Sequence, residues 1–437
     1  MSEPSTPPRP WYRCLRLRIS IRSLIVLVLI IGGGLGWIVH RARVQREAVV
    51  TIEEAGGLVF YDFQRTDYDI DPPTPPPKPW PEWVMNIIGI DYLSDVVSAS
   101  PSPLLETENK DKFFAAVTRL RGLKSLGLVY DLINDDDLVH LRDLTRLRDL
   151  TLSSSALKGP GFVYLVDMKD LRVLDVGNIP ASDSDLAALG KLNQLESLRL
   201  GGPNITDAGL THLRGLDLRK LSLWKCQISP RGLAQAEGLS QLESLLLDDL
   251  RVDDLQPLQA LKRLERLRIL NTQLTDESLG PLKKFRGLKW FGIDSPQITD
   301  AGMIPLQSLT GLTYLSLNNA QITDSGLARL AGLTKLETLV IGGTKITDAG
   351  LVHLAGMKNL SRVDLLFTSI TDAGLAHFSG LKNIEYLNLC GTNITDAGLV
   401  HLGGMKGDAL IDLSATGVTP TGVASLKKAA PRMLILP

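Results

Sequence analysis

Five of the six histidines occupy the same place in a repeating pattern, and histidine is the commonest metal ligand among side chains. They are His140, His212, His353, His377 and His401. The last three follow one another at intervals of 24 residues, which would set their imidazoles in a row. Packed helices stand about 8–10 Å apart, whereas one zinc ion holds its nitrogen ligands at about 2.1 Å. We therefore interpret these histidines as solvated helix surface, and we predict no metal site and no cofactor.

Signatures of catalysis are also missing from the sequence. It contains no HExxH, no phosphate-binding GxxxxGK[ST] and no GxSxG. The acidic run from Asn134 to Asp137 lies where a helix is expected to begin, so we interpret it as helix capping rather than metal ligation. The three cysteines, Cys14, Cys226 and Cys390, are too few and too scattered for a disulfide framework or a zinc site. We predict that the protein is not an enzyme.

The overall charge balance argues against a nucleic-acid partner. The chain has 437 residues, with 47 basic and 48 acidic side chains and a formal net charge of −1. Non-specific binding to nucleic acid depends on an excess of basic charge. Its absence leaves proteins, peptides and membranes as the partners to consider.

The N-terminal region contains an apolar segment. Residues 23–40 read SLIVLVLIIGGGLGWIVH, without a charged side chain other than the possible one of His40. As a helix this segment would cover about 27 Å, close to the bilayer core of about 30 Å. More arginines precede it than follow it, which predicts a cytoplasmic N-terminus and a repeat domain outside the cytoplasm. We expect a single-pass signal-anchor, and a cleaved signal peptide with Gly34 and Gly36 near the cut is the alternative.

The remaining segments follow from changes in composition. The helical RARVQREAVVTIEEA ends at Gly56 and Gly57, and LVFYDF predicts a short strand. The expected order is a basic tail (1–22), the transmembrane signal-anchor (23–40), a juxtamembrane helix and strand (41–70), a proline-rich spacer (71–82), an N-terminal cap (83–122) and a repeat domain (123–437).

A leucine pattern, LxxLxL, recurs through the repeat domain. Its starts fall at 123, 147, 171, 195, 218, 242, 264, 288, 312, 336, 360, 384 and 408. Ten of the twelve intervals are 24 residues long, and a fixed period in this range predicts units of one strand plus one short helix. Leu336, Leu339 and Ile341 would form the strand side of one apolar wall, and Leu351 and Leu354 the helix side, with Met357. The fold class that we expect is an α/β solenoid.

The segment TDAGL, which recurs in many units, has a local interpretation. Thr347 is a candidate N-cap, and Asp348 lies at the positive end of the helix dipole. Gly350 is unfavourable inside a helix, so we suppose that neighbouring units approach closely there, while Gly356 suits a left-handed helix end. Threonines at the ninth position of several units are expected to bond to backbone groups inside the turn, with Cys226 in the same place. These threonines are Thr272, Thr344, Thr368, Thr392 and Thr416.

The pattern LxxLxLxxTxITDAGLxxLxxL over residues 123–437 resembles the leucine-rich repeats whose cysteine-containing subtype occurs in F-box proteins. The resemblance implies a horseshoe of about 13 repeats. It does not carry a ubiquitin-ligase role, because nothing before residue 123 reads as an F-box helical bundle and the period of 24 is slightly short for that subtype. The N-terminal RISIRSLIVLVLIIGGGLGWIVHRARVQREAV is similar to that of bacterial membrane-anchored leucine-rich-repeat proteins, which implies a location rather than an activity.

The strand side chains between the leucines would point away from the apolar wall, toward the concave face. In the middle of the array they include Trp, Tyr and Arg, the residue types that dominate interface hot spots. The candidate partner-binding residues are Trp224, Asp248, Arg266, Arg268, Trp290, Asp294, Tyr314 and Asn318. Leu366, Phe367 and Tyr386 add apolar bulk farther along the chain.

The sequence therefore predicts a membrane-tethered scaffold that recognises a protein or peptide on its concave face. The alternative from another class is a structural cell-envelope spacer without a discrete ligand. An enzyme with an unfamiliar site is a third hypothesis, which turnover abolished by substitutions on the concave face would support.

Overall fold

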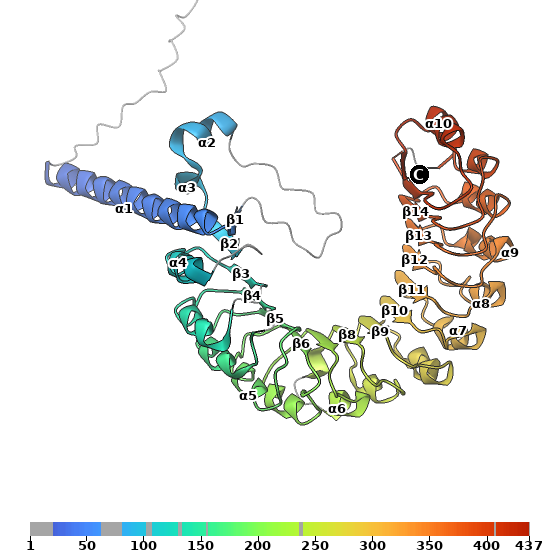
Figure 1. The fold of residues 1–437 in the computed structure, drawn as a ribbon, viewed down its shortest axis with the longest axis horizontal. Coiled ribbons are helices and arrows are strands. Elements are labelled where there is room, and N and C mark those ends of the chain that lie inside the picture. The colour runs from blue at the N-terminus through green and yellow to red at the C-terminus, as the bar shows by residue number, and fades with distance from the viewer. Residues whose placement is uncertain are drawn as a thin grey trace, which may run out of the picture.

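The computed structural model describes residues 21–62, 81–101, 107–129, 133–153, 156–235, 239–405 and 408–436. In these ranges sixteen strands form one sheet in sequence order, and every neighbouring pair except the first runs parallel. Figure 1 shows the sheet lining the inside of a horseshoe, with short helices along its outer side. The strands are β1 Leu58–Tyr61, β2 Val96–Ser100, β3 Ser125–Leu128, β4 Asp149–Leu152, β5 Val173–Val176, β6 Ser197–Gly201, β7 Lys220–Trp224, β8 Ser244–Asp248, β9 Arg266–Leu270, β10 Trp290–Asp294, β11 Tyr314–Asn318, β12 Thr338–Val340, β13 Arg362–Asp364, β14 Tyr386–Asn388, β15 Leu410–Asp412 and β16 Leu434–Leu436.

Short α-helical and 3₁₀-helical turns follow the strands on the outer side of the horseshoe, and α1, α2 and α3 lie at its N-terminal end (Figure 1). The α-helices are α1 Ile21–Glu54, α2 Glu82–Ile88, α3 Ile90–Leu93, α4 Thr107–Val117, α5 Leu186–Leu189, α6 Pro230–Gln235, α7 Met303–Leu306, α8 Asp324–Arg329, α9 Asp348–Leu351 and α10 Pro420–Ala429. The 3₁₀-helices are η2 Asp135–Leu141, η3 Pro160–Leu165, η4 Gly209–Leu213, η5 Leu239–Gln241, η6 Pro257–Ala260, η7 Glu277–Lys284, η8 Asp300–Gly302, η9 Val352–Gly356, η10 Gly374–Gly380 and η11 Gly398–His401.

The apolar wall between strands and helices is the core of the solenoid. Leu336, Leu339 and Ile341 on the strand side are fully buried, as are Leu351 and Met357 on the helix side. Because each repeat contributes one layer of such side chains, no repeat could shield them from water alone. A strand lies within each of the thirteen predicted units, and the parallel ladder continues beyond them into β2 at one end and β16 at the other. The predicted α/β solenoid is confirmed.

The N-terminal end of the core is closed by α1 and β1. The predicted helix over residues 41–55 is confirmed, because α1 continues to Glu54 just before the predicted stop at Gly56. Ala48 and Ile52 on α1 are fully buried, and α1 packs against α4. Strand β1 pairs antiparallel with β2. The side chain of Gln45 donates to the carbonyl of Ser94 at 2.9 Å and accepts from the amide of Val96 at 3.2 Å, so α1 is bonded to the strand that it covers.

Within the described residues, no helix combines the length and the apolar character needed to cross a membrane. The structure thus does not confirm the transmembrane segment expected at residues 23–40. Part of that segment, the side chains of residues 23–25 and 27, lies outside the description, as do residues 1–20 of the expected basic tail and residues 71–80 of the expected proline-rich spacer. The side chains of Val28, Leu29, Ile30 and Ile31 on α1 are exposed.

A ladder of aspartate–threonine bonds joins successive repeats on the helix side. The carboxylate of Asp324 accepts two hydrogen bonds from Thr347 in the next repeat, from the amide at 2.8 Å and from the hydroxyl at 2.6 Å. The same pair of bonds, with serine as the donor in one case, recurs from the following carboxylates: Asp183, Asp207, Asp276, Asp300, Asp348, Asp372 and Asp396. The bonds from Thr419 hold the pKa of Asp396 below its usual range.

This ladder explains the glycine of TDAGL and the bonding of the threonine before it. A Cβ atom at Gly350 would lie 2.3 Å from Oδ1 of Asp324, so the predicted close approach of neighbouring repeats is confirmed. Thr347 occupies the predicted N-cap position of α9, but its hydroxyl accepts no bond from an amide of that helix and donates to Asp324 instead. The left-handed helix end predicted at Gly356 is wrong, since this residue lies within η9 and is not among the residues with positive φ.

The threonines at the ninth position behave as predicted in four of the five cases. The hydroxyls of Thr344, Thr368, Thr392 and Thr416 each donate to the carbonyl oxygen three residues before, at 2.6–2.7 Å. The buried hydroxyl of Thr272 is the exception, without a partner among the described residues. Each bond satisfies a carbonyl where the chain leaves the strand, so the turn can be buried at low cost.

Candidate functional site

The concave face has the predicted alternation. In β8, Leu245 and Leu247 are buried while Ser244, Leu246 and Asp248 are half-buried on the opposite side. Parallel pairing sets residues of equal repeat position beside one another, so that Arg266 of β9 lies opposite Trp290 of β10, and Trp290 opposite Tyr314 of β11. Neighbouring strands lie about 4.8 Å apart, and side chains that stand up from this face therefore form rows across the sheet.

Three of the predicted residues, Arg266, Trp290 and Tyr314, come together in one such row, and Arg268 lies beside it two residues along β9. We call these four residues the aromatic row. The rings of Trp290 and Tyr314 stack at a centroid distance of 4.0 Å and an interplanar angle of 11°. The guanidinium of Arg268 lies 5.9 Å from the centroid of Trp290. The row is therefore a flat aromatic surface with cations at one end.

Gly292 leaves room for the indole of Trp290 because it has no side chain. A Cβ atom at Gly292 would lie 3.1 Å from two ring carbons of Trp290, tighter than most real contacts. The ring therefore leans along its own strand over the glycine, and its face is directed at Tyr314. The stacked rings hold each other in one arrangement, so a ligand that binds them loses less side-chain entropy than it would on free side chains.

The charge of the aromatic row is not neutralised within the described chain. Arg266 and Arg268 are exposed, and neither side chain forms a salt bridge or hydrogen bond with another described residue. Two like charges two residues apart on one strand face repel each other. The arrangement is therefore suited to a ligand that brings a carboxylate or another anionic group beside an apolar one.

Three other predicted residues take part in the turns at the strand ends. The carboxylate of Asp248 accepts from the side-chain amide of Asn271 at 2.7 Å, and that of Asp294 accepts from Asn319 at 3.1 Å. Both asparagines have positive φ, a conformation that asparagine tolerates. Asn318 lies opposite Asp294, and its buried Oδ1 has no partner in the described structure. The two aspartates therefore hold the turns beside the aromatic row in place.

Trp224, the eighth predicted residue, lies apart from the others. It stands at the end of β7, three strands from Trp290, and pairs in register with Asp248. The Nζ atom of Lys225 is 4.5 Å from the centroid of its ring. Three strand spacings correspond to about 14 Å across the sheet, so a ligand that contacts both Trp224 and Trp290 must span that distance, as a protein or peptide can.

A second cation–aromatic pair follows in the same row position and was not predicted as a site. The guanidinium of Arg362 in β13 lies 5.4 Å from the ring centroid of Tyr386 in β14. Beside it, burial raises the pKa of Asp364, although bonds from Leu366 and Asn388 oppose this shift. Arg362 and Tyr386 stand at the third position of their repeats, as Trp290 and Tyr314 do. That shared repeat position is the sequence signal from which the second pair could have been predicted.

Metal and histidine chemistry finds no support in the described residues. In that part of the chain, no three side chains among His, Cys, Asp and Glu stand close enough together to hold a metal ion. Asn134 and Asp137 form a reciprocal capping box at the start of η2, so the predicted capping role of this acidic run is confirmed. His140 stacks on Phe114 at a centroid distance of 5.2 Å, which is a packing role.

A curved parallel sheet with a single layer of repeats, and a half-buried aromatic row on its inner face, is the architecture of a solenoid with one inner surface. Residues 309–331 and 332–355 match the family model described as leucine-rich repeat. These two segments are similar to leucine-rich repeats. The finer resemblances to the cysteine-containing subtype and to bacterial membrane-anchored proteins stay predictions.

Several solved structures have a similar fold. An internalin from Listeria monocytogenes is 23% identical, with a TM-score of 0.48 and coverage of 74% of this chain and 92% of that chain. A leucine-rich-repeat protein from Leptospira interrogans is 18% identical, with a TM-score of 0.44 and coverage of 73% and 91%. The mouse RP105/MD-1 complex gives 20% identity, a TM-score of 0.49 and coverage of 74% and 56%. No curated protein matches the sequence. Identities of this size do not transfer a function from one chain to another.

Proposed function

We propose that the chain is a non-enzymatic recognition scaffold that binds a protein or peptide on its concave face. The observation that carries the proposal is the aromatic row, in which two stacked rings lie beside two guanidinium groups without an acidic partner. Tryptophan, tyrosine and arginine supply most of the binding energy in protein interfaces. A rigid row of these residues on the open side of a sheet suits the recognition of an anionic and apolar segment.

Membrane tethering through residues 23–40, with the repeats outside the cytoplasm, is the second part of the proposal. It is supported by the apolar sequence of that segment and by the exposed apolar side chains from Val28 to Val39 on α1. Protease treatment of intact cells, followed by mass spectrometry of the protected fragment, tests it. Cleavage of the repeats with retention of residues 16–22 is expected. Protected repeats with an accessible N-terminus would reverse the topology, and an N-terminus that begins beyond residue 34 would indicate cleavage.

The binding proposal is tested by affinity capture with quantitative mass spectrometry. Trp290→Ala and Arg268→Ala are each expected to reduce a captured partner at least about tenfold, as hot-spot substitutions do. Arg329→Ala is the matched control, because this exposed arginine lies on α8 of a nearby repeat on the outer side. A partner that survives both concave substitutions contradicts the proposal. The structural spacer, which has no discrete ligand, would tolerate all three.

A further inference from the structure

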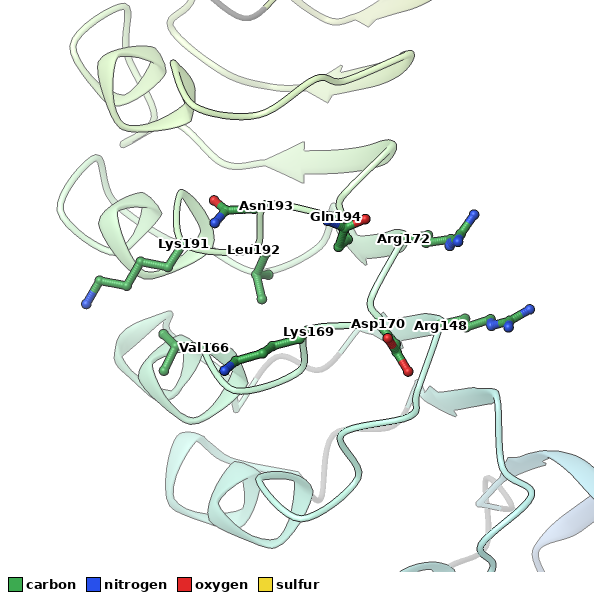
Figure 2. A pocket seen from close by; sticks show the side chains of 9 residues that line it. All are labelled: Arg148, Val166, Lys169, Asp170, Arg172, Lys191, Leu192, Asn193 and Gln194. Carbon is green, nitrogen blue, oxygen red and sulfur yellow. The ribbon is translucent and has the colours of Figure 1, made fainter.

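A hollow of about 410 Å³ opens between two neighbouring repeats, at the edge of the sheet where the strands begin. Figure 2 shows its lining from the segments that lead into β5 and β6. Arg148 and Arg172 extend toward one side of it, and Lys169 and Lys191 extend toward the helical side. The remaining lining residues are Val166, Asp170, Leu192, Asn193 and Gln194. The hollow is separate from the concave aromatic row.

The basic residues here are arranged differently from those elsewhere on the same edge. The amide of Arg148 bonds to the carbonyl of Lys124 at 2.7 Å, and that of Arg172 to the carbonyl of Arg148 at 2.8 Å. Three cations thus stand on consecutive strand entries. At the same position farther along, opposite charges pair instead, as Arg219 does with Glu243 and Lys289 with Glu265.

Most of this charge has no acidic partner. Arg172 forms a salt bridge with Glu196 at 3.1 Å. Within the described residues, the side chains of Lys124, Arg148, Lys169 and Lys191 form no hydrogen bond or ion pair. Like charges on adjacent strands repel each other and reduce stability. An anionic ligand would remove that repulsion.

The rest of the lining indicates what kind of anion fits. The buried Leu192 and half-buried Val166 offer an apolar floor, and the side-chain amides of Asn193 and Gln194 can both donate and accept hydrogen bonds. The carboxylate of Asp170 stands among the cations, which disfavours a uniformly charged polyanion. No aromatic ring lines this hollow for the stacking that single-stranded nucleic acids use.

We propose that this hollow binds a short acidic peptide segment with an apolar residue between its carboxylates. The carboxylates would pair with Arg148 on one side and with Lys169 and Lys191 on the other. The apolar side chain would lie on Val166 and Leu192, and the peptide backbone would bond to the two amides. This site lies apart from the concave face, so a negative result for binding here would not contradict the recognition site proposed there, nor the reverse.

The test uses the full chain and a fluorescein-labelled peptide with the sequence Glu-Glu-Leu-Glu-Glu, followed by fluorescence anisotropy at low and physiological salt. Saturable binding that weakens with salt is expected. Lys169→Glu should weaken it about fivefold, and Arg148→Glu combined with Lys169→Glu at least about tenfold. Lys262→Glu is the matched control, because this exposed lysine holds the equivalent position in a later repeat and makes the same charge change. It should leave the affinity within about twofold.

Two further probes decide the class of ligand. Replacement of the peptide leucine by serine should weaken binding several-fold, because the apolar floor would lose its contact. A heparin oligosaccharide tests whether charge alone is sufficient. The proposal is overturned if Lys169→Glu and Lys262→Glu weaken binding equally, if the serine peptide binds as well as the leucine peptide, if heparin binds more tightly than the leucine peptide, or if no saturable binding occurs below about 1 mM peptide.

Discussion

The glycine of TDAGL gives a quantitative test of how the repeats are joined. In Gly350→Ala the new Cβ atom would lie 2.3 Å from Oδ1 of Asp324, so the carboxylate must move. It would then lose its bonds of 2.8 and 2.6 Å to Thr347. Hydrogen bonds to a charged group contribute about 1.5 kcal/mol each, a total of about 3 kcal/mol. Alanine is favoured over glycine in a helix by about 1 kcal/mol, which leaves a net loss of about 2 kcal/mol.

Urea unfolding followed by circular dichroism measures this loss, and Gly356→Ala is the matched control in the same repeat. A Cβ atom there would meet a carbonyl oxygen at 3.9 Å, an ordinary contact, so the control should be neutral or slightly stabilised. In an Asp324→Ala background the penalty of Gly350→Ala should disappear, because the obstructing carboxylate is gone. Equal stabilities of Gly350→Ala and Gly356→Ala, or an undiminished penalty in the double variant, would refute the reasoning.

Three other outcomes are expected from single positions. Phe367 has a φ of 52° and is 64% exposed, so Phe367→Asn should raise the free energy of unfolding by about 1 kcal/mol in the same urea assay. Burial raises the pKa of the Cys226 thiol to about 11. In a chain with Cys14 replaced by serine, iodoacetamide at pH 8 should therefore label the half-buried Cys390 much faster than Cys226. Peptide mass spectrometry measures the two labelling rates, and equal rates would contradict this. Because the folded pKa of Asp364 is raised, the folded chain holds this proton more tightly, and the contribution of Asp364 to stability falls as pH rises from about 4 through the folded pKa. Relative to wild type, Asp364→Asn should therefore gain stability with rising pH, and urea midpoints with a constant difference between pH 4 and 7 would exclude this.

The repeat architecture could be predicted because, in a parallel solenoid, the spacing of the leucines along the sequence equals the length of one repeat. Leu339 is buried because it lies one strand layer from Leu315 on one side and from Val363 on the other, and all three occupy the same repeat position. The partner of Gly350 was not predictable in the same way. Its contact with Asp324 depends on how far one helix is displaced along its neighbour, and that displacement is not encoded in the period.

The candidate site was predictable in part for a related reason. Arg266, Trp290 and Tyr314 share the third position of consecutive repeats, so parallel pairing brings them together. Trp224 stands at the seventh position, three strands away, and the same rule separates it from them. The bonds from Asn271 to Asp248 and from Asn319 to Asp294 depend on side-chain directions in left-handed turns, which spacing does not reveal.

In a chain of nearly identical units, recognition must depend on where the units differ. The leucine pattern and the aspartate–threonine ladder recur in most repeats, and each instance stabilises its two neighbours without distinguishing one part of the surface from another. The aromatic row breaks the pattern on the concave face, and Lys124, Arg148 and Arg172 place three cations on consecutive strand entries. Both departures leave cations without acidic partners inside the described chain, an arrangement that reduces stability unless a ligand supplies the missing charge. The two surfaces lie on different sides of the solenoid, so one partner on each could be bound at the same time.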